Sequence, residues 1–452
     1  MFTYQIKKYA LKKYALTIAS FFLTLASMSV QAALPIKEIA LKSGAKLYFI
    51  ETRAIPMVDI GIDFTAGNYY DPAGKAGLSD LTAGMMNKGS KIAGKVKGEA
   101  YIADTVSDKG AILGFNSSSE NSSLRIRSLS RSDVLNPLVD EVADIVANPT
   151  FDATILDREK AREISALKEA ESKPEFMLSK QFQAMVYRQY PLGIPTTKES
   201  ITAIKADDLK KFHQRYYQAA SANVLIVGDL DQARAVAIAE KLTANLPKGE
   251  ALPQSMAVLE VLPKRPADQR EVRLANPSQQ AHIRMGLTGV PRNDPDYFPL
   301  MVGNYILGGG GFVSRLMNEV REKRGLAYSV SSYFYPGKTS GIFVAGLQTK
   351  KDQADQALSV MRTTIEQFVK DGPTDKELKA AKDNLINGFP LRIDSNRKLL
   401  DNMSSIAWNG LPLDTLDVWT QNVNKVTRED IERAFKKHLD VDRMVTVVVG
   451  AK

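Results

Sequence analysis

One pattern, a helix followed by a strand that ends in glycine, occurs twice in this chain. The first copy runs from Asp208 to Gly228 and the second from Asp430 to Gly450. In each copy the aspartate and the glycine are 20 positions apart, and the second copy lies 222 residues after the first. A fixed offset of about half the chain predicts an internal duplication. The alternative is a chance similarity between two helix–strand pairs.

A stretch between the two copies predicts a linker. Four prolines interrupt residues 246–268, which show little helical or strand periodicity. On either side the order of expected elements is the same: strands, then helices, then strands. This order favours an α+β class with two duplicated sandwich domains over a doubly wound sheet. We expect an N-terminal domain over 33–245 and a C-terminal domain over 269–452.

Several elements can be predicted locally. Apolar residues alternate with polar ones over 58–64, which predicts a half-buried strand, and residues 77–86 are typical of a helix. The turn Ser43-Gly44 separates two strand-like runs and predicts a hairpin. Further helices are expected over 133–147, 154–171 and 175–187, and further strands over 109–115, 122–126, 270–274 and 282–287.

Residues 1–32 have the pattern of a secretory leader. Four lysines precede an uncharged run that ends in Val30-Gln31-Ala32, a small-x-small cleavage site. An uncleaved membrane anchor is the alternative. Loss of the leader lowers the formal charge from +9 to +5, which is no nucleic-acid signature. The absence of cysteine excludes disulfides and thiol catalysis. We expect an exported protein, periplasmic if the source is a Gram-negative bacterium.

Four consecutive glycines, Gly308, Gly309, Gly310 and Gly311, interrupt the second half. Glycine is favoured where a backbone approaches another group closely or takes a positive φ. Helical spacing follows, Gly325 predicts the end of that helix, and residues 328–334 have strand propensity. No Gly-Lys-Ser/Thr follows the glycines, so they do not predict a phosphate loop.

This arrangement can present Arg321 and Tyr328 together. A permanent cation and a phenolic donor suit a polarised peptide carbonyl. The alternative is that Arg321 pairs with a surface carboxylate and Tyr328 is an ordinary strand residue.

Nearly the whole chain beyond residue 32 resembles the pitrilysin/insulinase-type, or inverted-zincin, metallopeptidases, which include mitochondrial processing peptidase. The segments that carry the resemblance are residues 67–78, 148–151, 208–228 and, most specifically, 307–328. The resemblance implies half of a clamshell-shaped peptidase, with a mixed or antiparallel sheet in each domain and helices on one side.

In that family a helix carries His-x-x-Glu-His, in which two histidines bind zinc and the glutamate activates water. Here Asp80, Ala83 and Gly84 occupy those three positions. The third ligand should fall near Ser165 and Ala166, and Glu163 lies within one turn of them. The resemblance therefore implies that this chain has lost its zinc site; a weak cation site at Asp80 and Glu163 is a minor alternative.

The histidines agree with this interpretation without any family knowledge. The chain has three, His213, His282 and His438, and none has a second histidine within five residues. We expect no metal ligands in this chain.

The resemblance assigns Arg321 and Tyr328 to a pair that related two-chain peptidases place opposite the zinc of a partner subunit. It implies that both residues hold the substrate backbone and stabilise the oxyanion, that Gly308 to Gly311 lie along the substrate, and that zinc is bound by the partner. A non-catalytic peptide-binding or scaffold protein of the same fold is the main alternative. A self-contained peptidase with an unusual site is a weaker one.

Overall fold

The structure is a computed structural model that describes residues 35–248, 252 and 256–450. The expected leader, residues 1–32, lies outside the described residues. The first half contains these elements in chain order: β1 (Lys37–Ala40), β2 (Lys46–Glu51), β3 (Met57–Phe64), α2 (Leu78–Met85), β4 (Gly89–Ile92), β5 (Lys95–Gly98), α3 (Glu99–Asp108), β6 (Ile112–Ser117), β7 (Ser122–Leu129), α4 (Ser132–Ala147), α5 (Ala153–Glu171), α6 (Pro174–Tyr187), α7 (Lys198–Ala203), α8 (Ala206–Tyr216), β8 (Asn223–Gly228) and α9 (Gln232–Thr243).

The second half repeats most of this order after residues 256–266, which form no helix or strand. Its elements are α10 (Ala267–Arg270), β9 (Glu271–Leu274), β10 (Gln280–Gly289), α11 (Tyr297–Asn304), β11 (Ala327–Tyr335), β12 (Gly341–Lys350), α12 (Ala354–Asp371), α13 (Asp375–Gly388), α14 (Asn396–Asn409), α15 (Thr415–Lys425), α16 (Arg428–His438) and β13 (Val445–Val449). Helix α8 and strand β8 correspond to α16 and β13 at an offset of 222 residues, the offset seen in the sequence.

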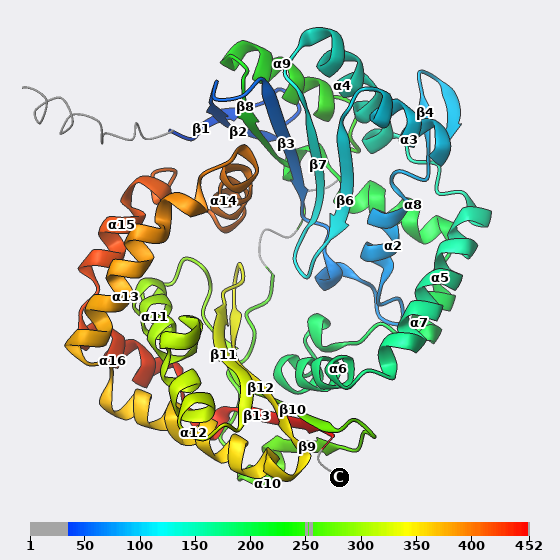
Figure 1. The fold of residues 1–452 in the computed structure, drawn as a ribbon. Coiled ribbons are helices and arrows are strands. Elements are labelled where there is room, and N and C mark those ends of the chain that lie inside the picture. Colours follow the sequence, from blue (N-terminus) through cyan, green and yellow to red (C-terminus); the bar gives the residue numbers. More distant parts are fainter. Residues whose placement is uncertain (1–34, 249–251, 253–255, 451–452) are drawn as a thin grey trace, which may run out of the picture. The chain divides into compact units, whose positions relative to one another are not determined.

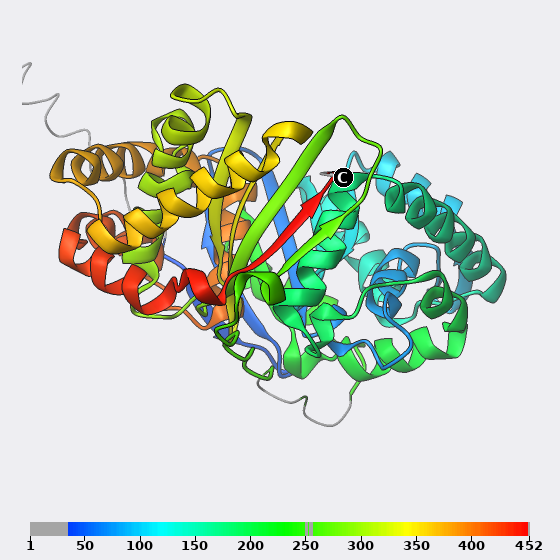
Figure 2. The same ribbon diagram turned by 90° about the horizontal axis from the view of Figure 1, so that it is seen from below.

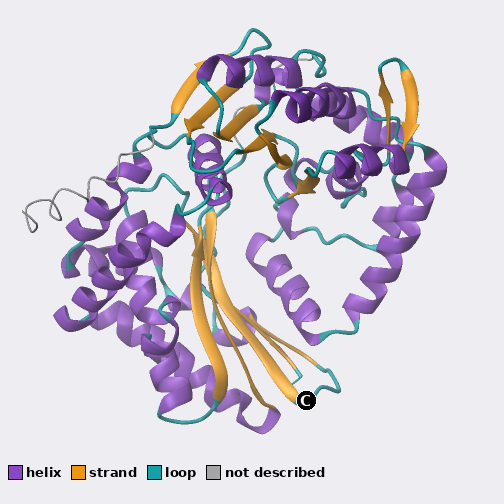
Figure 3. Ribbon diagram, turned by 45° about the horizontal axis from the view of Figure 1, so that its top comes forward, coloured by secondary structure: helices purple, strands orange, loops and turns teal. Residues whose placement is uncertain are grey.

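Each half builds one large mixed sheet. The strand order is β1-β2-β8-β3-β7-β6 in the first and β11-β12-β10-β13-β9 in the second (Figures 1 and 3). β2 runs parallel to β8 and β9 parallel to β13, whereas the other neighbours in these two sheets are antiparallel. Corresponding strands occupy corresponding places, so the duplication extends to topology. The red strand β13 lies beside β9 and β10 in Figure 2.

The two halves exchange one helix. Helix α6 belongs to the first half but packs on β13 and β10 of the second sheet, and α14 belongs to the second half but packs on β8 and β3 of the first (Figure 1). Phe182 of α6 is accordingly buried in the second core, while Met403 of α14 is buried against Leu225 and Val227 of β8. The α+β sandwich class is therefore confirmed. In addition, each sheet is packed against one helix from the other half of the chain.

This exchange explains one wrong prediction. Strand β3 was expected to be half-buried, yet both of its faces are covered, and the acidic residues Asp59 and Asp63 are buried. Asp59 pairs with Arg127 at 2.9 Å and Asp63 with Arg125 at 2.6 Å, both on the neighbouring β7. A buried carboxylate needs such a partner because burial removes the hydration that stabilises its charge.

Among the described residues, no helix has both the length and the apolar character needed to cross a membrane.

Candidate functional site

The start of helix α2 is organised by Asp71. Its carboxylate accepts hydrogen bonds from the backbone N–H groups of Gly77 at 2.7 Å and Ser79 at 2.8 Å. Gly77 has a φ of 98°, a conformation that costs glycine little because it has no Cβ. The segment from Gly67 to Leu78 therefore fixes where α2 begins and which side chains it presents.

Helix α2 does not carry a zinc site. Asp80 reaches solvent at the rim of a cavity, although the surrounding protein removes part of its hydration, and it accepts a hydrogen bond from Asn68 Nδ2 at 2.9 Å. Ala83 is buried, and Gly84 faces open space, with no atom within 4 Å of where a Cβ would lie. Neither alanine nor glycine offers a ligand atom, so these residues do not fit the family's zinc.

Glu163 is the residue of α5 that interacts with this part of α2. Partial burial, together with repulsion from Asp80 and Asp71, raises the pKa of Glu163 to about 7. Burial also raises the pKa of Asp71 to about 6, and it raises the pKa of Asp80. The third-ligand position was expected near Ser165 and Ala166. Glu163, within one turn of these residues, is close enough to Asp80 for electrostatic repulsion between the two carboxylates.

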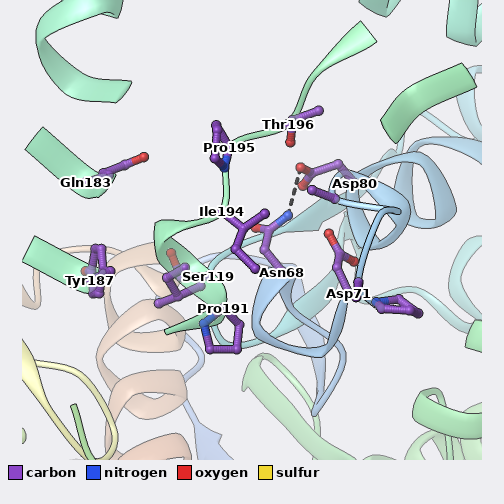
Figure 4. A pocket seen from close by; sticks show the side chains of 14 residues that line it. Asn68, Asp71, Asp80, Ser119, Gln183, Tyr187, Pro191, Ile194, Pro195 and Thr196 are labelled. Atoms are coloured by element: carbon purple, nitrogen blue, oxygen red, sulfur yellow. Dashed lines mark hydrogen bonds between the residues drawn. The ribbon is translucent and has the colours of Figure 1, made fainter. Parts of the chain in front are cut away.

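A cavity of about 230 Å³ is lined by Asp71 and Asp80, whereas Glu163 does not line it (Figure 4). Helix α6 contributes Gln183 and Tyr187, and the chain after it contributes Pro191 to Thr196. No lysine or arginine lines the cavity, and no ion pair joins Asp71, Asp80 or Glu163 to a cation within the described part of the chain. Asp71 and Asp80 thus make this cavity an acidic hollow.

Each of the three histidines lies in a different part of the fold and interacts with neighbouring protein groups. His213 is buried, its Nε2 lies 2.8 Å from the carbonyl oxygen of Val146, and burial lowers its pKa to about 4. His282 lies on β10, where burial also lowers its pKa. His438 ends α16 and bonds to Asp296 at 2.9 Å. They belong to three separate elements, as their spacing predicted.

Asp294, Asp296 and His438 bring their ligand atoms within 4.8 Å of one another. However, Asp296 already binds Lys437 Nζ at 2.8 Å and Arg433 Nη2 at 3.2 Å. Burial opposes ionisation of Asp296, but Lys437, His438 and Arg433 outweigh it and lower its pKa. Cations of the protein therefore occupy this carboxylate, and the group joins α11 to α16.

The glycine run is packed tightly at three of its four positions. A Cβ would lie 2.4 Å from Ser332 Oγ at Gly308, 2.9 Å from Asn304 Nδ2 at Gly309 and 2.6 Å from the carbonyl oxygen of Tyr305 at Gly310. At Gly311 the surroundings are open, but φ is +60°. Close packing of a π-helical turn, Tyr305–Gly309, against β11 thus requires small residues here.

The helical segment after the glycines is anchored by Arg315. Its guanidinium makes two hydrogen bonds of 2.7 Å to Glu377 and one of 2.9 Å to the carbonyl oxygen of Gly372. The segment was expected to be helical, and residues 317–322 form a π-helix. Gly325, with a φ of +60°, ends it as predicted, and β11 follows.

The structure brings Arg321 and Tyr328 together. The guanidinium carbon of Arg321 lies 4.7 Å from the centre of the Tyr328 ring, a cation–π distance. Tyr328 is 83% exposed at the start of β11, so its hydroxyl is available to a ligand. No hydrogen bond or ion pair links this pair to α2 within the residues that the structure describes.

Comparisons with known proteins agree with this architecture. The family model described as "Insulinase (Peptidase family M16)" matches residues 49–200, and the model described as "Peptidase M16 inactive domain" matches residues 203–385. A solved structure from Pseudomonas fluorescens, described as a peptidase M16 inactive domain, is 33% identical with a TM-score of 0.86, and the match covers 92% of this chain and 98% of that one. The chain belongs to peptidase family M16.

Two more distant matches are informative. "Non-peptidase homolog YmxG" of Helicobacter pylori is 24% identical over 428 residues, which is 94% of this chain and 96% of that protein. The periplasmic protease PqqL of Escherichia coli has a TM-score of 0.77 at 17% identity, covering 93% of this chain and 46% of that one. At such identity the PqqL likeness shows the fold alone. The family resemblance and the fold class inferred from the sequence are confirmed.

Two contributors to these sites had no predicted role. Asp71 lies in a segment that carried the family resemblance, and its Asp-Pro turn before a helix was a usable signal. Phe312 follows the four glycines, where a large apolar residue in a loop is unusual. Both depend on contacts that sequence spacing does not reveal.

Proposed function

We propose that this chain is the zinc-less subunit of an exported heterodimeric metallopeptidase, inactive by itself, and that it lends Arg321 and Tyr328 to a partner that binds zinc. The observation that carries the proposal is the contrast between the two halves. The positions that match the family's zinc motif hold Asp80, Ala83 and Gly84, whereas Arg321 and Tyr328 are both present and adjacent, with Tyr328 largely exposed and Arg321 partly exposed. In this role both residues donate to the substrate carbonyl and to the oxyanion that develops from it.

Two other features favour a peptide ligand. Strand β6 is an edge of the first sheet and lies next to α2, so its unpaired backbone groups can accept an extended peptide. Gly311 has open space around it, which lets a backbone approach the loop. Export is supported by the leader-like residues 1–32, and the E. coli relative PqqL is named a periplasmic protease.

The test requires the natural partner. Affinity capture of the native protein, followed by mass spectrometry, should identify an M16 chain that carries His-x-x-Glu-His. Each purified chain and their mixture are then incubated with a quenched fluorescent peptide library. We expect peptide cleavage only when the two chains are mixed, and we expect a chelator to abolish that cleavage. Chelator-sensitive cleavage by this chain alone would refute the proposal.

A substitution then assigns the role of the phenol. Tyr328→Phe should lower turnover of the mixture by about 10²-fold, the usual scale for one oxyanion donor, with assembly unchanged. Tyr333→Phe, an exposed tyrosine on the same strand, is the matched control. Equal rates for both variants would remove Tyr328 from the mechanism.

The second candidate is a non-catalytic peptide-binding or scaffold protein of the same fold. The name "non-peptidase homolog" given to the H. pylori relative favours it. It predicts that no zinc-bearing M16 chain is encoded beside this one or captured with it.

A further inference from the structure

The guanidinium of Arg321 lies within cation–π distance of two aromatic rings. Its guanidinium carbon is 4.9 Å from the centre of the Phe312 ring and 4.7 Å from that of Tyr328. Guanidinium groups stack favourably on aromatic faces because the ring quadrupole attracts the cation. Two rings within this range restrict the plane of a side chain that otherwise has several free torsions.

Phe312 does not fill a hydrophobic core. Its side chain is 68% exposed, and the following Val313 is 75% exposed. The positive φ of Gly311 makes the turn that leads into Phe312, and Ser314 Oγ closes it with a hydrogen bond of 2.7 Å to the carbonyl oxygen of Gly311. The structure gives this exposed ring a contact with the guanidinium of Arg321.

The N–H groups of Arg321 are left without a strong acceptor. Among the described residues, its polar side-chain neighbour is Glu322, whose Oε1 lies 3.5 Å from Nε. Arginine has five N–H donors arranged in one plane. The Arg321 side chain is 27% exposed, so an acceptor from outside the chain can reach its N–H groups.

The loop that carries Phe312 is itself held firmly. Asn304 donates to the carbonyl oxygen of Ser332 at 2.9 Å and accepts from its hydroxyl at 2.6 Å, which joins the end of α11 to β11. Gly308 packs directly on Ser332, and Arg315 is bound to Glu377. Phe312 and Tyr328 thus project from segments that are fixed to each other.

From these contacts we propose that Phe312 is a positioning residue: it holds the Arg321 guanidinium against Tyr328 so that its N–H edge meets the carbonyl oxygen of a bound peptide. This inference rests on the proposed function. Phe312 donates no hydrogen bond, so it acts through Arg321. An aromatic ring is therefore required at position 312, whereas an aliphatic side chain of similar size does not suffice.

The experiment compares Phe312→Leu with the conservative Phe312→Tyr. First, the isolated chain is treated with phenylglyoxal, and the modification rate of Arg321 is measured by peptide mass spectrometry. We expect the rate to rise about threefold or more in Phe312→Leu and to stay at the wild-type level in Phe312→Tyr. Arg324, which is bound to Glu319, serves as the internal reference. An unchanged Arg321 rate in Phe312→Leu would overturn the proposal.

The second arm uses the complex with the zinc-bearing subunit and the same peptide library. Phe312→Leu should lower kcat about tenfold, with a smaller change in KM, and Phe312→Tyr should restore it. A faster labelling rate with unchanged kcat would refute the positioning role. If no wild-type mixture cleaves peptides, the proposed function fails and the positioning role fails with it, whereas the labelling rates still decide whether Phe312 holds Arg321.

Discussion

Glu120 accepts a hydrogen bond from Trp408 Nε1 at 2.8 Å, which ties the turn between β6 and β7 to the end of α14. The second carboxylate oxygen accepts from the backbone N–H of Lys338 at 2.9 Å, and the Lys338 ammonium lies 4.3 Å from the Trp408 ring. One residue of the first half therefore holds two segments of the second.

We expect this junction to contribute measurably to stability. Trp408→Phe removes the donor but keeps an aromatic ring, and should lower the free energy of unfolding by about 1.5–3 kcal/mol, the range for hydrogen bonds to charged groups. A double-mutant cycle with Glu120→Ala, followed by chemical denaturation, isolates the pair. Strict additivity of the two substitutions would show that the contact contributes nothing.

The exchange of α6 and α14 predicts that the halves unfold together. Phe182→Ala and Met403→Ala each create a cavity in a core to which the other half contributes. Each should cost about 2–5 kcal/mol and shift one common calorimetric transition. Leu391→Ala, at an exposed site close to α14, is the control and should change stability by less than about 0.5 kcal/mol. Two separate transitions, each sensitive to only one variant, would contradict this prediction.

Much of the fold could be predicted because its signals are local. Turn residues and periodicity predict the hairpin around Gly44, helix α2 and strand β11. The fixed offset between the two copies predicts the duplication. The exchanged helices could not be predicted. Periodicity in α6 shows that it has an apolar face but does not say which sheet will cover that face.

The site shows the same limit. Sequence spacing placed Arg321 and Tyr328 near each other because a helix end and a strand start are separated by a tight glycine stop. The π-helical register and the ring of Phe312 depend instead on how the glycines pack on Ser332, which is a tertiary contact. Likewise, the burial of Asp63 depends on Arg125 and on a helix more than 300 residues away.

The mutually repelling carboxylates Glu163, Asp71 and Asp80 predict a specific pH dependence. The pKa of Glu163 is about 7 in the folded chain, above its ordinary value of 4.5, so between these values the folded state holds the proton more tightly than the unfolded chain does. The contribution of Glu163 to stability is therefore highest below pH 4.5 and falls as the pH rises through 7. Asp71, with a pKa of about 6, acts in the same direction.

Glu163→Gln should remove this penalty. We expect the melting temperature of the variant to exceed that of the wild type by about 1–2 °C at pH 8, because partial solvent access moderates the effect, and to equal it at pH 4.5. Asp157→Asn, at an exposed position of the same helix, should show no such pH-dependent difference. A Glu163→Gln effect of equal size at both pH values would point to packing instead of charge.

The correspondence between α2 and a zinc helix can be tested by restoring the ligands. Positions 80 and 84 lie one turn apart on the same face of α2, and Gly84 has space for a larger side chain. Asp80→His combined with Gly84→His should therefore create two imidazole ligands near Glu163. We expect the double variant to bind one zinc ion per chain in competition with a chromophoric chelator, whereas the wild type and Asp80→His alone do not.

The third ligand gives this test its discriminating control. If Glu163 occupies the family's glutamate position, adding Glu163→Gln to the double variant should weaken zinc binding by about tenfold or more, because a neutral amide replaces an anionic ligand. Binding should also weaken as the pH falls, since protons compete for both imidazoles. Unchanged affinity after Glu163→Gln would mean that another residue of α5 corresponds to the third ligand. Failure of the double variant to bind zinc would mean that more than the ligands themselves has been lost, such as the approach of α5 to α2 that a metal ion needs.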